Sequence, residues 1–157
     1  RGVDVGDRWR ALADNWAPLA TAGLYAFNDF HAVMTFVGAG RRHDAEAVLA
    51  AQVEAMSREG DNARFGREVG HPVCRAIVAF GDGDYRRAVG LLRPVRSIAA
   101  MFGGSHAQRD VIDLTLVEAA LRTGDAGLAL SLAAERAEMR HDSPLSQLFL
   151  RRARALQ

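Results

Sequence analysis

A chain of 157 residues, 49% of them hydrophobic, is long enough to bury a continuous core and is not typical of a disordered protein. Twenty basic residues against nineteen acidic ones leave a formal charge of only +1, so nucleic acid is not an expected partner. The single cysteine, Cys74, excludes an internal disulfide, and no apolar run has the length of a membrane span. We therefore predict a cytoplasmic protein with no membrane partner.

Glycine, proline and capping residues divide the chain into about seven to eight helices, and no segment alternates as a strand does. The predicted fold class is all-α. Trp9 and Trp16 are expected on one face of the first helix, Pro94 inside the fifth is expected to kink it, and Ser105 with Gln108 predicts a capping box for the sixth. In chain order the expected helices cover about 4–17, 22–38, 43–58, 70–81, 84–101, 106–123, 126–139 and 144–156.

A glycine, an alanine five residues later and a small or apolar residue four further on recur at three helix junctions. Such a recurring junction indicates helical hairpins, each of which must bury its apolar face against the next. We predict antiparallel hairpins over about 22–58, 70–101 and 105–139 and a capping helix over about 144–156, stacked as a tetratricopeptide-like α-solenoid. The whole chain, 1–157, is then a single helical-repeat domain or a piece of a longer array. The three series are Gly40–Ala45–Leu49, Gly83–Ala88–Leu92 and Gly124–Ala129–Ala133.

Two segments carry more polar groups than helix packing requires. In 27–31, Asn28 and His31 lie one turn apart, and they either join a hydrogen-bond network or line a cavity. In 103–110, Arg109 and Asp110 follow a helix N-terminus that attracts anions, although a structural interpretation in which Arg109 pairs with Asp113 is favoured. These two pairs are the candidate ligand-binding or partner-binding residues.

The sequence contains no catalytic or metal-binding motif. The five histidines lie in different predicted elements and Cys74 has no partner cysteine, so we expect no catalytic residue, no metal site and no cofactor. Cys74 is expected to be a small buried residue on an apolar helix. The arginines at 86, 93 and 96 share one sector of the fifth helix and are interpreted as a solvated face.

Five blocks of this sequence resemble the tetratricopeptide repeat protein 38 family in the same order. The match spans about residues 24–150, and it departs from the family at His106, where members can carry asparagine. The resemblance implies the C-terminal part of a longer helical-repeat protein with no settled enzymatic activity or ligand. The blocks are Phe27-Asn28-Asp29-Phe30-His31, Glu68 to Ala76, Leu91 to Arg96, Gly103-Gly104-Ser105 to Val111, and Asp142-Ser143-Pro144-Leu145.

The function expected from the sequence is that of a non-catalytic scaffold whose curved stack of helices binds a protein or peptide. The alternative is a small-molecule or enzymatic site built from Asn28, His31, Arg109 and Asp110, which would require these groups to converge on one enclosed pocket. We also expect exposed apolar end helices, the helix over 22–38 among them, to permit self-association.

Overall fold

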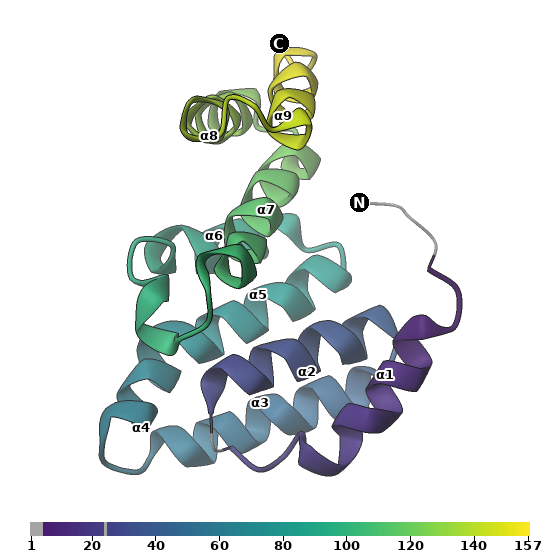
Figure 1. Cartoon of the computed structure of the whole chain (residues 1–157), viewed down its shortest axis with the longest axis vertical. Coiled ribbons are helices and arrows are strands. Elements are labelled where there is room, and N and C mark those ends of the chain that lie inside the picture. Colours follow the sequence, from purple (N-terminus) through teal and green to yellow (C-terminus); the bar gives the residue numbers. More distant parts are fainter. Residues whose placement is uncertain (1–4, 24) are drawn as a thin grey trace.

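The computed structural model describes residues 5–23 and 25–157, and within these ranges it contains helices and turns but no strand (Figure 1). The predicted all-α fold class is confirmed. The α-helices are α1 (Arg8–Trp16), α2 (Ala26–Gly38), α3 (Arg42–Met56), α4 (Asp61–Phe65), α5 (His71–Gly81), α6 (Tyr85–Val95), α7 (His106–Thr123), α8 (Ala126–Met139) and α9 (Pro144–Arg154). The 3-10 helices η1 (Ala17–Leu19) and η3 (Ala99–Phe102) and the π-helical turn η2 (Gly66–Gly70) join them.

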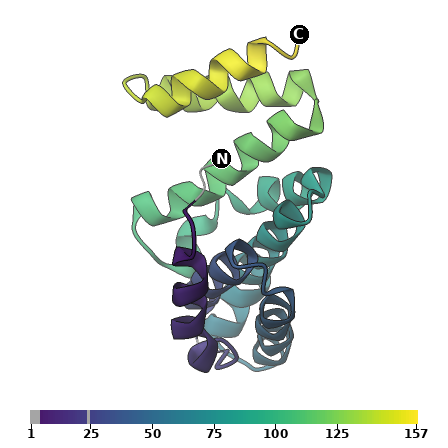
Figure 2. The same ribbon diagram turned by 90° about the vertical axis from the view of Figure 1, so that its right-hand side faces the viewer.

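Consecutive helices pack against one another along the chain. The helix α2 lies between α3 and α5, α5 also packs on α6, and α6 packs on α7. The helix α7 then leads away from these helices to α8 and α9, which pair with each other at the far end (Figures 1 and 2). The molecule thus has two regions, which we call the lower region (α1–α6 with η1–η3) and the upper region (α8 and α9), with α7 connecting them.

The three junctions found in the sequence have the same local structure. The three glycines adopt positive φ angles of 71°, 80° and 74°, which L-residues with side chains rarely adopt. Each alanine that follows is 0% exposed, so a small side chain is needed where the two helices of a junction meet. These junctions are Gly40 with Ala45, Gly83 with Ala88, and Gly124 with Ala129.

The predicted fifth helix, 84–101, is wrong at its C-terminal end. The helix α6 ends at Val95, one residue after Pro94, because proline lacks an amide proton and its ring crowds the preceding turn. The chain then turns into η3, which places Phe102 in the core at 1% exposure. Its ring makes edge contacts with Phe27 and Phe30 of α2, at centroid distances of 5.5 and 5.9 Å.

A further difference lies between α3 and α5, where no helix was expected between about residues 58 and 70. Instead, α4, η2 and α5 form one continuous helical run that begins after Gly60. The π-helical turn η2 brings Gly70 onto α2, where a Cβ atom would stand about 2.5 Å from the Cβ atom of Ala26. The close approach of two small residues therefore allows this second helical hairpin to pack tightly on the first.

The N-terminal helix packs on α2 through the face that carries its two tryptophans, which the sequence analysis placed on one face. Trp9 lies over Gly38 and Trp16 stacks on His31, with ring centroids 6.5 Å apart. The expected start at Asp4 lies outside the described residues, and α2 begins at Ala26 rather than at 22. The apolar residues of α2 are mostly buried, so the exposed apolar side chains at this end belong instead to Trp9, Leu12 and Leu19.

None of the helices in the described ranges is long and apolar enough to cross a lipid bilayer.

Candidate functional site

A pocket opens between the C-terminal end of α6, the first turns of α7 and the C-terminal end of α8. Its volume is about 240 Å³, and alanines of the 97–100 segment and Ile112 form its apolar part. Two of the four candidate residues from the sequence, Arg109 and Asp110, lie in this pocket. The ionisable side chains that line it are Arg96, His106, Arg109, Asp110, Asp113 and Arg140.

The position of α7 in this pocket depends on the glycine pair that precedes it. Gly103 and Gly104 have positive φ angles of 91° and 77°, and a Cβ atom on Gly104 would overlap the ring of Phe27. The chain therefore passes against α2 before α7 begins. Ser105 then caps the helix: its Oγ accepts from the amide of Gln108 at 3.3 Å, and the Gln108 side chain accepts from the Ser105 amide at 2.9 Å. The predicted capping box is confirmed.

Arg109 does not pair with Asp113 as the favoured structural interpretation expected. Its Nη1 donates to the carbonyl oxygen of Gly103 at 3.1 Å and to that of Gly104, and its Nη2 lies 3.4 Å from Nδ1 of His106. Asp113 accepts instead from Nε of Arg96 at 2.9 Å. The glycine pair turns its carbonyl groups back toward the first turn of α7, so their oxygens can accept from Arg109. The spacing of residues along the sequence does not indicate this contact.

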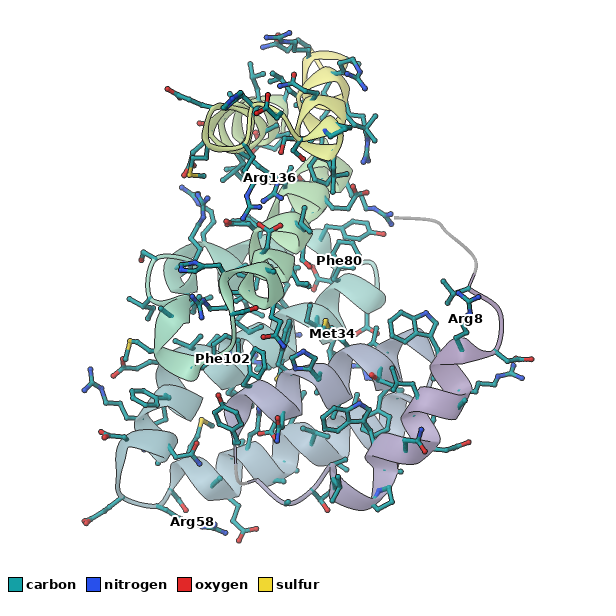
Figure 3. The ribbon with its side chains drawn as sticks, viewed as in Figure 1. Arg8, Met34, Arg58, Phe80, Phe102 and Arg136 are labelled. Atoms are coloured by element: carbon teal, nitrogen blue, oxygen red, sulfur yellow. The ribbon has the colours of Figure 1, made fainter. Side chains whose placement is uncertain are left out.

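Asp110 forms the junction between α7 and α8. Both of its oxygens accept from Arg136, at 2.8 Å each, and Arg140 lies 3.2 Å away. The side chain of Arg136 lies between α8 and α7 (Figure 3). Arg136 is 4% exposed, and this two-pronged contact is the geometry in which a guanidinium binds a carboxylate most strongly. Arg140 is half-exposed and contributes a second positive charge to the same carboxylate.

Arg96 is not part of a solvated face, contrary to the sequence interpretation. Its guanidinium is about three-quarters buried and binds Asp113 of α7 and Glu135 of α8, each at 2.9 Å. It therefore joins three helices at the rim of the pocket. The sequence analysis missed Arg136 and Arg140 as well, since all three contacts depend on helices that are far apart along the chain.

The other two candidate residues lie elsewhere. Nδ1 of His31 donates to the carbonyl oxygen of Phe27 at 2.8 Å within α2, and the ring packs against Trp16. Asn28 is exposed and lines a different, smaller cavity of about 130 Å³ together with Leu19 and Tyr25. The structure thus brings Arg109 and Asp110 together but does not bring Asn28 into the same pocket.

A buried polar network occupies the junction of α2, α3 and α5, and it centres on a residue the sequence analysis did not single out. The amide nitrogen of Gln52 donates to Asp29 at 3.1 Å and to the sulfur of Cys74 at 3.3 Å, and its oxygen lies 3.1 Å from Nδ1 of His71. Burial raises the pKa of Asp29, although the Gln52 hydrogen bond opposes this shift. The polar segment 27–31 pointed to this network, but its buried member is Asp29.

Cys74 is fully buried in that network, as predicted. Burial raises the pKa of its thiol to about 12, so the nucleophilic thiolate is scarce at neutral pH. Among the described residues no group of three His, Cys, Asp or Glu side chains is placed to hold a metal ion.

No family model matches this chain, and no solved structure matches it.

Proposed function

We propose that this chain is a tetratricopeptide-like α-solenoid scaffold that binds a protein or peptide partner in the cytoplasm. The support comes from the serial packing of α2 with α3, α5 with α6, and α7 with α8, and from three junctions that share a glycine with positive φ and a fully buried alanine. In such folds each hairpin contacts its neighbours and the stack presents an extended surface.

The observation that carries the proposal is the pocket beside α7. It is built by side chains from successive hairpins, lies where α7 leaves the lower region, and combines an apolar floor with several charged groups. Binding surfaces of helical repeats arise in this way, because each repeat contributes a few side chains to a shared crevice.

The alternative, a small-molecule or enzymatic site made from all four candidate residues, has less support. Asn28 and the pair of Arg109 and Asp110 line separate cavities, and His31 uses its Nδ1 within its own helix. The arginines and aspartates of the larger pocket are held in ion pairs or by backbone groups, and among the described residues that line it no nucleophile is hydrogen-bonded to a base. A binding role therefore fits this geometry better than catalysis.

We extend the proposal to membership of the tetratricopeptide repeat protein 38 family, with this chain as the C-terminal part. In support, two of the sequence blocks that carry the resemblance, 27–31 and 103–111, meet in space through Phe27 and Gly104. The exposed apolar side chains of Trp9, Leu12 and Leu19 at the α1 end support a second proposed contact, the association of two copies.

Selection from a random peptide library displayed on phage tests the scaffold proposal. We expect enriched peptides that bind the chain and lose binding when Arg140→Ala alters the pocket. Arg93→Ala is the matched control. Arg93 is an exposed arginine near the C-terminal end of α6, close to the pocket in sequence, but its side chain does not line the pocket. Peptides that bind both variants equally, or the absence of any enriched peptide, would contradict the proposal.

A further inference from the structure

We infer that the pocket beside α7 binds a single carboxylate group carried by the partner peptide. The inference rests on the proposed scaffold function and names the chemistry of its partner. It is carried by the charge balance inside the pocket, by the bonding of Arg109 and by the apolar floor.

The guanidinium groups of the pocket outnumber its carboxylates. Three arginines and two aspartates line it, and both aspartates already have partners. Asp113 binds Arg96. Both oxygens of Asp110 accept from Arg136, which is not one of the residues that line the pocket. Glu135 is bound by Arg96 as well. With Arg136 and Glu135 included, four guanidinium groups stand against three carboxylates, so these described residues carry one positive charge in excess.

Two arginines that line the pocket share this excess charge. Within the described residues, the polar contacts of Arg109 are with the two glycine carbonyl oxygens and with Nδ1 of His106, and none is with a carboxylate. Arg140 has Asp110 as its ion-pair partner, and Arg136 already occupies both oxygens of that carboxylate. A planar guanidinium in a partly enclosed site binds a carboxylate through charge-assisted hydrogen bonds, which are about twice as strong as neutral ones.

The remaining surface favours a carboxylate on an aliphatic stem over an inorganic anion. Ala99, Ala100 and Ile112 line the pocket beside the arginines, and of these Ala100 is exposed. Methylene groups of a glutamate side chain or of a C-terminal residue would cover this apolar surface, whereas phosphate has no apolar part and would leave the surface exposed to water. A monoanion also matches the single excess positive charge, while a dianion would exceed it.

The test uses short peptides and the nitrogen resonances of the arginine side chains. We expect the blocked peptide acetyl-Ala-Glu-Ala-amide to shift the Arg109 and Arg140 Nε signals in a saturable way, and its Gln counterpart to shift neither. Acetyl-Ala-Ala-Ala with a free C-terminus distinguishes a main-chain carboxylate from a side-chain one. Inorganic phosphate is expected to bind more weakly than the better of the two carboxylate peptides. Equal binding of the Gln peptide, or tighter binding of phosphate, overturns the inference.

Two substitutions with opposite expected signs separate binding from structural effects. Arg140→Ala should lower the affinity for the carboxylate peptide about 10-fold or more, because it removes a charge-assisted contact while Arg136 still holds Asp110. Asp113→Asn should raise the affinity for the peptide, because it removes a carboxylate that competes with the peptide for Arg96. Glu135 continues to hold Arg96 in this variant. Arg93→Ala should change nothing. Weaker binding by Asp113→Asn, or unchanged binding by Arg140→Ala, contradicts the inference.

The peptide library separates failure of this inference from failure of the scaffold proposal. Selected peptides that require Arg140 but contain no acidic group would leave the scaffold proposal standing and overturn the carboxylate. Arg109→Ala is a less useful probe, because losing its bonds to Gly103 and Gly104 is expected to lower the melting temperature as well.

Discussion

The lower and upper regions of this molecule are stabilised in different ways. In the lower region, aromatic side chains of α2 and η3 interlock, and Phe30, Phe36 and Phe102 are almost completely buried. The upper region has fewer large buried side chains, and two carboxylates of α7 hold it: the partly buried Asp110 binds Arg136 of α8, and the buried Glu118 binds Arg152 of α9. Apolar packing is nearly independent of salt and pH, whereas ion pairs are not. The two regions should therefore respond differently to solution conditions.

One buried acid in the lower region and one on α7, at the junction with the upper region, show the contrast at the level of single groups. Burial raises the pKa of Asp29, whose carboxylate accepts one side-chain hydrogen bond within the described residues, from the neutral Gln52. Burial also acts to raise the pKa of Glu118, but hydrogen bonds from Arg152 and Arg122 outweigh it and the net shift is downward. Arg122 is itself fixed over the rings of Phe80 and Tyr85 of the lower region. Only the acid at the junction with the upper region thus has cationic partners.

The largest expected effect comes from the aromatic packing of the lower region. Phe102→Ala should lower the free energy of unfolding by about 3–5 kcal/mol, because it leaves a cavity between η3 and α2. Leu19→Ala, at a side chain 65% exposed, is the control and should change it by less than about 0.5 kcal/mol. Urea denaturation monitored by circular dichroism measures both. Similar values for the two variants would show that Phe102 is not part of the core.

The next effect tests whether the junctions in the two regions are equally tight. Ala88→Leu in the lower region should cost about 1–3 kcal/mol, since a fully buried alanine leaves no room for three more carbon atoms. Ala129→Leu is the matched change between α7 and α8. Thermal melts of both variants measure the difference. A tolerated Ala129→Leu beside a destabilising Ala88→Leu would mean that the upper junction is looser, and two tolerated variants would contradict the packing of both.

Glu118→Gln should destabilise the upper region by about 1–2 kcal/mol, less than loss of a fully buried ion pair, because Arg122 and Arg152 are partly exposed and regain water. The folded-state pKa of Glu118 is lowered, so its contribution is present above the ordinary value of 4.5 and is lost as pH falls through the folded value. Hydrogen exchange measured along α9 and α2 should show α9 opening first in acid. Equal opening of the two helices would remove the distinction between the regions.

The smallest expected effect has the opposite sign. Asp29→Asn should raise the melting temperature at neutral pH, because a buried carboxylate without a cationic partner is replaced by a neutral group that still accepts from Gln52. The raised folded-state pKa means that acidification relieves the wild type, so the gain should shrink as pH falls through that value and vanish below the ordinary 3.8. Melting curves over this pH range measure the gain. A constant difference would show that the charge of Asp29 is not responsible.

The sequence by itself determined the features of this protein that depend on local chemistry. Glycines with positive φ, the capping box of Ser105 and Gln108, and the helical period act over a few residues, so the helices and their junctions were predictable. The end of α6 was misplaced because Pro94 was read as a kink rather than a stop, and the short helix α4 had no strong periodic signal.

Only the tertiary structure decided which groups meet. Asp110 and Arg136 are 26 residues apart, and their contact depends on the angle at which α8 packs on α7, which no spacing along the chain records. The pocket beside α7 arises from that packing, since side chains on separate helices acquire a common environment only after the helices have stacked.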